Sequence, residues 1–420
     1  MAENYDEVYL ASQENPRAFW GEAAKLAHWY KAPSTILDDA NPPFLQWFPD
    51  GETNACYNAL DRHVADGRGE QDALIYDSPV TGTKLRFSYH ELLKRVSIFA
   101  GALRSEGIAK GDRVIIYMPM VPEAAIAMLA CARIGAVHSV VFGGFAANEL
   151  AVRIDDIEAK MVIAASCGIE PGRLVPYKPL LDEAIELANN KPQTCIVLQR
   201  EQSRGEMQPG RDKCWHELET VANPVDCVPM LSTDPLYVLY TSGTTGLPKG
   251  VLHSHASLLA GGANTANAHQ LTVDDRALCV LSLCHINGQV VTVMAPLVSG
   301  SSVVMPSRFS ASQFWNWVAD YGCTWFSAVP TILSYLVQGD ELDSSPGKRF
   351  SRLRFGRSAS APLPPALLES FVTRFQIPIV ETMGITETAA QILSNPLDPA
   401  RQQVGSTGIP WGNAVRIAND

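Results

Sequence analysis

The chain lacks the features that mark several classes of protein. Its nine cysteines include no Cys-x-x-Cys pair, and an odd, scattered set fits reduced thiols in a cytosolic protein better than a disulfide framework. Positive charge is in deficit, since 33 Lys and Arg against 44 Asp and Glu give a net charge of −11, which argues against nucleic acid as the main partner. The most apolar stretch, residues 124–141, is broken by Arg133 and His138, so no membrane span is predicted.

Signals for export and for repetition are also missing. The first seven residues, Met-Ala-Glu-Asn-Tyr-Asp-Glu, are acidic and polar, which fits neither a secretory signal nor an Arg-rich transit peptide. No internal repeat or long low-complexity segment occurs. We therefore expect a cytoplasmic protein, and a length of 420 residues predicts two or three packed subdomains.

Apolar periodicity alternates between strand and helix over much of the chain. A strand is predicted at residues 113–118, a helix at 121–134 and another strand at 137–142. Ser88 followed by Glu91 forms a capping box, which predicts a helix start. This rhythm predicts an α/β fold with mostly parallel sheet and helices on both faces. The expected divisions are a leader packed on the core (1–69), a first α/β subdomain (70–230) and a second α/β subdomain (231–420).

One segment carries more chemical information than the rest. Residues 240–250 read Tyr-Thr-Ser-Gly-Thr-Thr-Gly-Leu-Pro-Lys-Gly and follow a predicted strand at 236–240. Glycines permit close approach, successive N–H groups can form an anion nest, and Lys249 adds a positive charge, so this loop can wrap a polyphosphate. The spacing is not that of the P-loop ATPases, whose Lys precedes Ser or Thr. A flexible surface loop is the alternative for such a composition.

Three further segments contain candidate site residues. Residues 358–363, Ser-Ala-Ser-Ala-Pro-Leu, place small side chains at a strand-to-helix turn, where a flat ring can approach the backbone. Residues 381–388 read Glu-Thr-Met-Gly-Ile-Thr-Glu-Thr, and residues 283–288 read Leu-Cys-His-Ile-Asn-Gly. Taken singly, these segments have ordinary alternatives: a tight turn, a helix N-cap and a histidine held by packing. His253 and His255 have no third ligand nearby in the sequence, so no metal site is predicted there.

Together and in this order, the segments resemble the motifs of the acyl-adenylate-forming superfamily, which includes acyl-CoA synthetases, luciferases and peptide-synthetase adenylation domains. The resemblance runs from about residue 5 to residue 417, and residues 44–51 resemble the leader of the acetyl- and propionyl-CoA synthetase branch. It implies the fold of the large N-terminal domain of these enzymes, with two mostly parallel sheets flanked by helices and a small distorted β-barrel region. A β-region at 414–418 would begin that barrel.

The resemblance also implies roles for individual residues. The catalytic residues would be Lys249, Thr386 as the α-phosphate donor, and Glu387 as the ligand of Mg²⁺. His285 and Gly384 would border the acyl group. ATP would be bound by residues from three motifs: Thr241, Ser242, Gly243, Thr244, Thr245, Gly246, Ser360, Ala361, Pro362, Glu381, Thr382 and Met383.

The predicted coenzyme A site and the predicted acyl pocket both depart from the family pattern. Gly143 and Arg173 would bind coenzyme A, with a phosphate facing the guanidinium, but Glu170 stands where the branch often has a second Arg. Met383 replaces the usual Tyr that stacks on adenine. Gly384 replaces the bulky Trp that closes the pocket of acetate synthetases, which predicts an acid larger than propionate.

The family's sequence continues beyond the motifs found here. A Thr-Gly-Asp that holds the ribose, a hinge, and a small mobile domain with an adenylation Lys would follow residues 405–410, and none of them occurs before Asp420. We therefore expect the C-terminal small domain to be absent from this chain and both half-reactions to be severely impaired in it.

The predicted function is that of an ATP-dependent, AMP-forming carboxylate–CoA ligase that uses ATP, Mg²⁺, coenzyme A and a small-molecule carboxylate. An amino acid is not expected as the acid, because no Asp lies at 277–296 to pair with an ammonium group. Two alternatives stay open, namely an adenylating enzyme that loads a carrier protein and a non-catalytic nucleotide-binding relic. The sequence predicts no oligomeric state.

Overall fold

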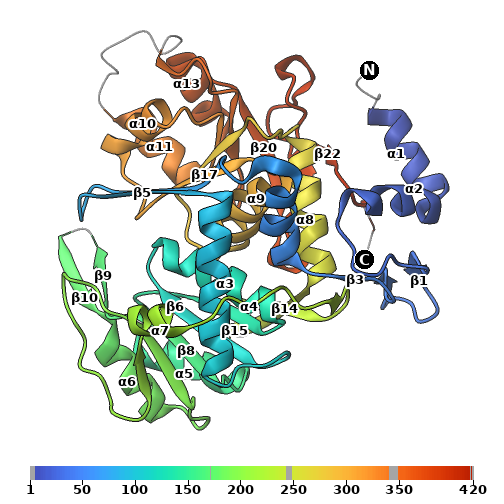
Figure 1. Cartoon of the computed structure of the whole chain (residues 1–420). Coiled ribbons are helices and arrows are strands. Elements are labelled where there is room, and N and C mark those ends of the chain that lie inside the picture. Colours follow the sequence, from blue (N-terminus) through green and yellow to red (C-terminus); the bar gives the residue numbers. More distant parts are fainter. Residues whose placement is uncertain (1–4, 171, 243–247, 340–348, 417, 419–420) are drawn as a thin grey trace.

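Two large sheets form the body of the protein. The computed structural model describes residues 5–170, 172–242, 248–339, 349–416 and 418 (Figure 1). In the view of Figure 1, a nine-stranded sheet lies in the upper half and a seven-stranded sheet in the lower half. Helix α3 (Tyr89–Ser105) contacts strands of the upper sheet and helices of the lower part. The predicted α/β fold of two mostly parallel sheets flanked by helices is confirmed.

The nine-stranded sheet is parallel over its central six strands. In order across the sheet, its strands are β22 (Ile409–Pro410), β21 (Gln391–Ser394), β20 (Ile379–Gly384), β19 (Phe355–Ser358), β18 (Trp325–Ala328), β16 (Arg276–Cys279), β17 (Ser302–Pro306), β4 (Asp72–Ser78) and β5 (Thr83–Ser88). Strands β5 and β21 pair antiparallel with their inner neighbours, and β22 pairs antiparallel with β21.

The seven-stranded sheet has one antiparallel edge. In order, its strands are β12 (Asp212–Cys214), β11 (Thr194–Leu198), β8 (Met161–Ala165), β6 (Arg113–Met118), β7 (Val137–Phe142), β14 (Pro235–Ser242) and β15 (Pro248–Ser254). Strands β14 and β15 form an antiparallel hairpin at the edge. Three short two-stranded ladders complete the strands: β1 (Leu37–Asp38) with β2 (Gln46–Trp47), β3 (Glu52–Thr53) with β13 (Met230–Leu231), and β9 (Cys167–Glu170) with β10 (Arg173–Pro176).

Helices cover the faces and edges of the sheets. Besides α3, the α-helices are α1 (Tyr5–Glu14), α2 (Pro16–Ala23), α4 (Pro122–Ile134), α5 (Ala147–Asp156), α6 (Tyr177–Leu187), α7 (Trp215–Val221), α8 (His255–Ala268), α9 (Ala295–Ser299), α10 (Ala311–Asp320), α11 (Pro330–Gln338) and α13 (Pro365–Phe375). The 3-10 turns are η1 (Ala24–Leu26), η5 (Thr386–Thr388) and η6 (Pro399–Arg401). The π-helical segments are η2 (Tyr57–Asp61), η3 (Val64–Arg68) and η4 (Asn287–Met294). No helix among these described residues has the length and apolar character needed to cross a membrane.

Local sequence signals set several element boundaries. The Ser88 hydroxyl accepts a hydrogen bond from the Glu91 N–H at 3.2 Å, and the Glu91 carboxylate accepts one from the Ser88 N–H at 2.8 Å, so the predicted capping box begins α3. Strands β6 and β7 and helix α4 lie where the apolar periodicity predicted them.

The β-region expected at 414–418 is not found. Residues 414–416 and 418 adopt no strand, and residue 417 lies outside the described residues. In place of a closed barrel, β21 and β22 extend the edge of the nine-stranded sheet in the described part of the chain. Whether a segment forms a strand depends on pairing with a neighbour as well as on local propensity, and the edge of an existing sheet offers such pairing to β21 and β22.

Strand pairing crosses both of the divisions that the sequence suggested. Strands β4 and β5, from the region 70–230, lie in the nine-stranded sheet beside β17. Strands β14 and β15, from the region 231–420, lie in the seven-stranded sheet beside β7. The divisions at 69/70 and 230/231 therefore stay a proposal about the sequence, while each sheet takes strands from both regions.

The buried core has two parts. The larger cluster fills the space around α3, α4 and the seven-stranded sheet and extends to η4. The second cluster is rich in aromatic rings and packs α10, α11 and α13 on the nine-stranded sheet, with members that include Phe314, Trp317, Phe326, Phe371 and Phe375. Apolar burial on this scale is the main favourable term in folding.

The close contact at Gly101 in α3 gives a prediction about stability. A Cβ at this position would lie 1.8 Å from the backbone oxygen of Asn223. Gly101→Ala should therefore lower the free energy of unfolding by about 1–3 kcal/mol through overpacking, although Ala in a helix otherwise gains up to about 1 kcal/mol over Gly. Thermal and urea unfolding measure the change.

The matched control is Gly262→Ala in α8, where a Cβ would meet its nearest neighbour at an ordinary 3.7 Å. That variant should be neutral or more stable. Equal stability of the two variants would contradict the contact between α3 and Asn223.

Candidate active site

A pocket of about 630 Å³ opens where the two sheets approach each other. Its walls come from the β14–β15 hairpin, the segment that leads into η4, the residues after β18 and β19, the end of β20, and η5. The pocket is lined by Thr241, Lys249, Leu281, His285, Ile286, Asn287, Val329, Ser360, Gly384, Ile385, Thr386 and Glu387. A position at the carboxyl ends of parallel strands is the usual place for ligands in α/β sheets.

Several predicted site residues that are far apart in the sequence line this pocket. The predicted site residues among the lining are Thr241, Lys249, His285, Ser360, Gly384, Thr386 and Glu387. Sequence reasoning assigned no role to Leu281, Ile286, Asn287, Val329 and Ile385, which also line the pocket. Ile286 and Asn287 lie inside the segment 283–288. The motif therefore predicted that this segment borders the site, but it predicted no role for these two residues.

The hairpin places Thr241 and Lys249, two residues of the predicted phosphate-binding segment, at the pocket. Thr241 is opposite Lys249 in the register of β14 and β15, and Ser242 is opposite Pro248. The Lys249 side chain is exposed and lines the pocket. The predicted residues Gly243, Thr244, Thr245 and Gly246 lie outside the described residues.

A hydrogen bond holds the turn that contains Thr386 and Glu387. His253 Nε2 donates to the Thr386 carbonyl at 2.7 Å, and His253 Nδ1 lies 3.2 Å from the Ser257 hydroxyl. Burial lowers the pKa of His253, which keeps the ring neutral near pH 7 and leaves Nε2–H as the donor. His253 is thus a positioning residue for η5, and it links β15 to the turn after β20.

The residues predicted to bind ATP from the segments 358–363 and 381–388 fall into two groups. Ser360, Ala361 and Pro362 are exposed, and Ser360 has a φ of 72°, which is strained for a side-chain-bearing residue. The side chains of Glu381 and Thr382 are buried and do not line the pocket. They join β20 to the neighbouring turn, because the Glu381 carboxylate accepts from the Leu363 N–H at 3.3 Å and Thr382 Oγ1 donates to the Ser358 carbonyl at 3.4 Å.

Burial raises the pKa of Glu381, and its bond to Leu363 opposes that shift. Met383 is 43% exposed and lies outside the pocket lining, so its predicted contact with adenine stays a prediction.

Gly384 lies against the neighbouring strand. A Cβ there would be 2.3 Å from the Ala390 carbonyl oxygen and 2.8 Å from the Gln391 Cα. Because both atoms belong to the backbone, no side chain fits at 384 unless β21 moves. Gly384 therefore both allows β21 to approach and leaves the pocket wall without a side chain.

The two predicted coenzyme A residues lie near each other but outside this pocket. The Glu170 carboxylate accepts from Arg173 Nε at 2.9 Å and from Nη2 at 2.7 Å. The same carboxylate lies 3.0 Å from where a Cβ of Gly144 would be, which brings β9 and β10 beside the loop that contains Gly143. The Gly143 carbonyl accepts a hydrogen bond from the Tyr177 hydroxyl. A phosphate at Arg173 would compete with Glu170 for the guanidinium.

One group of potential metal ligands occurs elsewhere in the described residues. Cys56, Asp61 and Cys227 bring their ligand atoms within 4.8 Å of one another. The Arg133 guanidinium occupies this group, since it bonds both Asp61 oxygens at 2.8 and 3.0 Å and lies 3.1 Å from Cys227 Sγ. A positive charge in that place opposes a cation there.

Comparison with known sequences identifies the family of the chain. The profile of the AMP-binding enzyme family matches residues 61–420, and the profile of the acetyl-coenzyme A synthetase N-terminus matches residues 5–59. The chain therefore belongs to the AMP-binding enzyme family, on its acetyl- and propionyl-CoA synthetase branch, and the resemblance noted from the motifs is confirmed.

Named relatives lie on the same branch. The chain is 39% identical over 433 residues to the rat protein named acyl-CoA synthetase short-chain family member 3, mitochondrial, and covers 63% of it. It is 38% identical over 430 residues to an acetyl-coenzyme A synthetase of Xanthomonas campestris and covers 65% of it. An uncharacterized protein of Pseudomonas aeruginosa is 45% identical over 344 residues, which is 54% of that protein. These matches take in 99%, 97% and 80% of this chain, so the chain spans only part of the length of its relatives.

The bond from His253 to the Thr386 carbonyl gives a prediction about nucleotide affinity. His253→Phe keeps a ring but removes the donor, which loosens the turn that carries Thr386 and Glu387. Because one hydrogen bond contributes about 1 kcal/mol, Mg·ATP should bind about fivefold more weakly, as measured by calorimetry.

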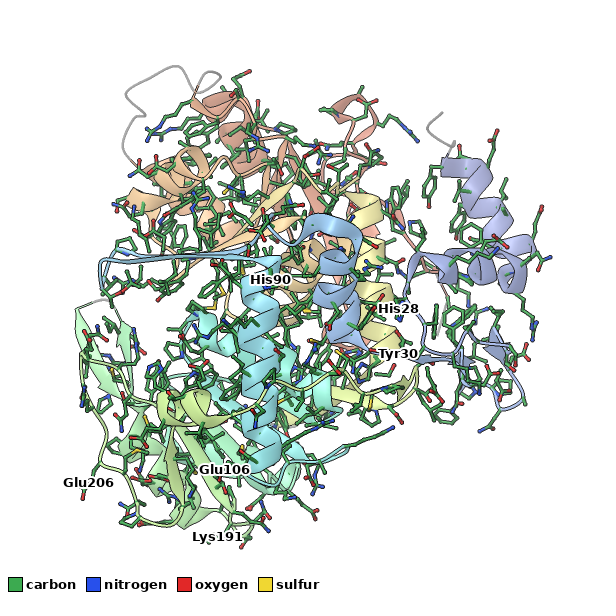
Figure 2. All side chains as sticks on the ribbon, viewed as in Figure 1. His28, Tyr30, His90, Glu106, Lys191 and Glu206 are labelled. Carbon is green, nitrogen blue, oxygen red and sulfur yellow. The ribbon has the colours of Figure 1, made fainter. Side chains whose placement is uncertain are left out.

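His90→Phe is the control, because His90 is exposed at the start of α3 and is not among the residues that line the pocket (Figure 2). Unchanged affinity in the His253 variant would show that η5 keeps its position without this bond.

Proposed function

We propose that this protein has the function of an ATP-dependent, AMP-forming carboxylate–CoA ligase. The observation that carries the proposal is one pocket that gathers Lys249, Thr386 and Glu387 with the segment around His285. A positive charge, a hydroxyl donor and a carboxylate in one open pocket suit a polyphosphate and its metal ion. The adjoining apolar wall of Leu281, Ile286 and Val329 suits the carbon chain of an acid.

The proposed reaction has two steps. A carboxylate oxygen of the acid attacks the α-phosphorus of ATP, and pyrophosphate leaves to give an acyl-adenylate. The thiol of coenzyme A then attacks the acyl carbon, and AMP leaves. A carboxylate oxygen is a poor leaving group and AMP a good one, which is why the first step is needed.

The residues of the pocket have matching tasks in this proposal. Lys249 holds the pyrophosphate side, where negative charge grows in the first step. Thr386 holds the α-phosphate. The exposed Glu387 carboxylate would hold Mg²⁺, since hard oxygen ligands suit this ion, and the ion supplies charge neutralisation at the phosphates when bound. Thr241, Ser242, Gly243, Thr244, Thr245 and Gly246 complete the proposed phosphate site.

The acid is proposed to be larger than propionate. Support comes from Gly384, which leaves the pocket wall without a side chain, and from the apolar residues that line the space beside it. The name of the Xanthomonas relative indicates acetate as the acid of that protein. The acid proposed for this chain is larger, so the two proteins would differ in substrate.

The identity of the acyl acceptor depends on Arg173. Because Arg173 is already paired with Glu170, its contact with coenzyme A is weakened, and this favours a second candidate function. In that function the acyl group passes to the thiol of a carrier protein. Consumption of coenzyme A, compared with loading of a carrier by the full-length protein, separates the two. Location in the cytoplasm remains part of the proposal, and the rat relative's name places that protein in mitochondria.

The 420-residue chain alone is proposed to be severely impaired in both half-reactions. Support comes from the comparison, since the match covers 63% of the length of the rat relative. Pyrophosphate exchange by this chain near the rate of the full-length protein would contradict this.

Nucleotide binding tests whether the pocket is functional. Lys249→Ala removes a charge-assisted contact to phosphate worth about 2 kcal/mol, so Mg·ATP should bind about thirtyfold more weakly by calorimetry. Lys94→Ala removes an exposed Lys of α3 and should leave the affinity unchanged. Absence of ATP binding, or an affinity indifferent to Lys249, would favour the non-catalytic relic.

An acid panel tests the size of the acid. With the full-length protein, pyrophosphate exchange should be faster with acids of about four to eight carbons or with aromatic acids than with acetate, because a chain that fills the apolar wall gains about 0.8 kcal/mol per buried methylene. Turnover of acetate equal to or better than that of the longer acids would overturn the size proposal and leave the reaction class standing.

A further inference from the structure

A fully buried guanidinium lies directly behind the acyl wall of the pocket. Arg357 occupies the middle of β19 and is 2% exposed. Its Nη1 donates to Asn287 Oδ1 at 2.9 Å and to the Ser327 hydroxyl at 3.0 Å. Its Nε is buried without an acceptor, and no Asp or Glu in the described part of the chain forms an ion pair with it.

Such a group is unusual, because a buried charge is normally paired. Removing an ion from water costs several kcal/mol even after relaxation, and a neutral amide and a hydroxyl offset only part of that cost. Burial lowers the pKa of Arg357 to about 9, which still leaves it charged at pH 7. Its positive charge also acts on His269, whose pKa falls through burial and through the nearby guanidinium groups of Arg357 and Arg354.

Asn287 connects this charge to the pocket. Its side-chain oxygen accepts from Arg357 Nη1 and from the Ser327 hydroxyl, the latter at 2.8 Å. Because the side-chain oxygen of Asn287 accepts from two donors, the orientation of the amide is fixed, and Nδ2 points away from Arg357 and Ser327. That nitrogen is buried and has no acceptor in the described structure, although Asn287 itself lines the pocket. Asn287, a residue of the pocket wall, thus carries an unused buried donor, and its oxygen contacts an unpaired cation.

We propose that the acid taken by this pocket is a short dicarboxylate, whose second carboxylate accepts a hydrogen bond from Asn287 Nδ2 and lies in the field of Arg357. This inference rests on the proposed ligase function and narrows its substrate class. One carboxylate of the acid reacts with ATP, and the other is the recognised group. A monoacid of the same length would leave the buried donor unsatisfied, which is costly, and an ammonium group would be repelled.

A purely structural role for Arg357 is the rival explanation. The two bonds of Nη1 join β19 to β18 and to the start of η4, and this would brace the wall without any ligand. That role explains the two hydrogen bonds that Arg357 Nη1 donates. It leaves Arg357 Nε and Asn287 Nδ2 without acceptors, whereas a bound anion supplies charge compensation and an acceptor at the pocket side.

The test compares non-hydrolysable acyl-sulfamoyl adenosines, which mimic the adenylate, in pairs of equal chain length: succinyl against butyryl and glutaryl against pentanoyl. Calorimetry on the wild-type chain should give at least tenfold tighter binding of the dicarboxylate member of one pair. Arg357→Met and Asn287→Leu should each reduce that ratio to about one or below. Arg352→Gln removes an exposed charge from the segment before β19 and should leave the ratio unchanged.

Each result has a distinct meaning. If neither member of a pair binds and Mg·ATP does not bind either, the proposed ligase function fails together with this inference. If the monoacid mimics bind as well as or better than the dicarboxylate mimics, the inference is overturned and the ligase function stands. A preference for the dicarboxylate that survives in both variants places the anion elsewhere and also overturns it. Should Arg357→Met not fold, Asn287→Leu decides, because it removes the pocket donor and keeps the bond between Arg357 and Ser327.

Discussion

The hydrogen bond between His253 and Thr386 links the edge hairpin of the seven-stranded sheet to the turn after β20 of the nine-stranded sheet, and the pocket lies at this junction. His253 belongs to β15 of the seven-stranded sheet, and Thr386 follows β20 of the nine-stranded sheet. The imidazole can donate this bond whether it is neutral or protonated, and burial, which lowers the pKa of His253, keeps the ring neutral near pH 7. Lining residues from both sheets, such as Lys249 and Glu387, face one space at this junction.

Positive charge in this acidic protein is placed locally. Lys249 is exposed at the pocket, where an anionic ligand can pair with it. Arg173 is paired with Glu170, so its charge is already largely satisfied. Arg357 is buried and has only neutral hydrogen-bond partners in the described chain. These three environments give similar charges different chemistry, since exposure, pairing and burial decide what each can attract.

Much of the fold and part of the site could be predicted from sequence. The Ser88–Glu91 capping box and the strands at 113–118 and 137–142 depend on near neighbours, and they appear where expected. Residues 414–416 and 418, the described part of the strand expected at 414–418, form no strand, whereas β22 pairs with β21 earlier in the chain. The motif around His285 marked the acyl wall, but the orphan donor of Asn287 depends on Arg357, seventy positions further along the chain.

The sequence by itself determined the family, the order of the motifs and the residue types of a phosphate-binding pocket, because those are written in short local strings such as 240–250 and 381–388. Only the tertiary structure decided which of those residues share one space, that Glu381 and Thr382 turn inward, and that Gly384 lies against the backbone of β21. The physical reason is that burial, pairing and close approach are properties of contacts between distant segments, and local sequence does not specify those contacts.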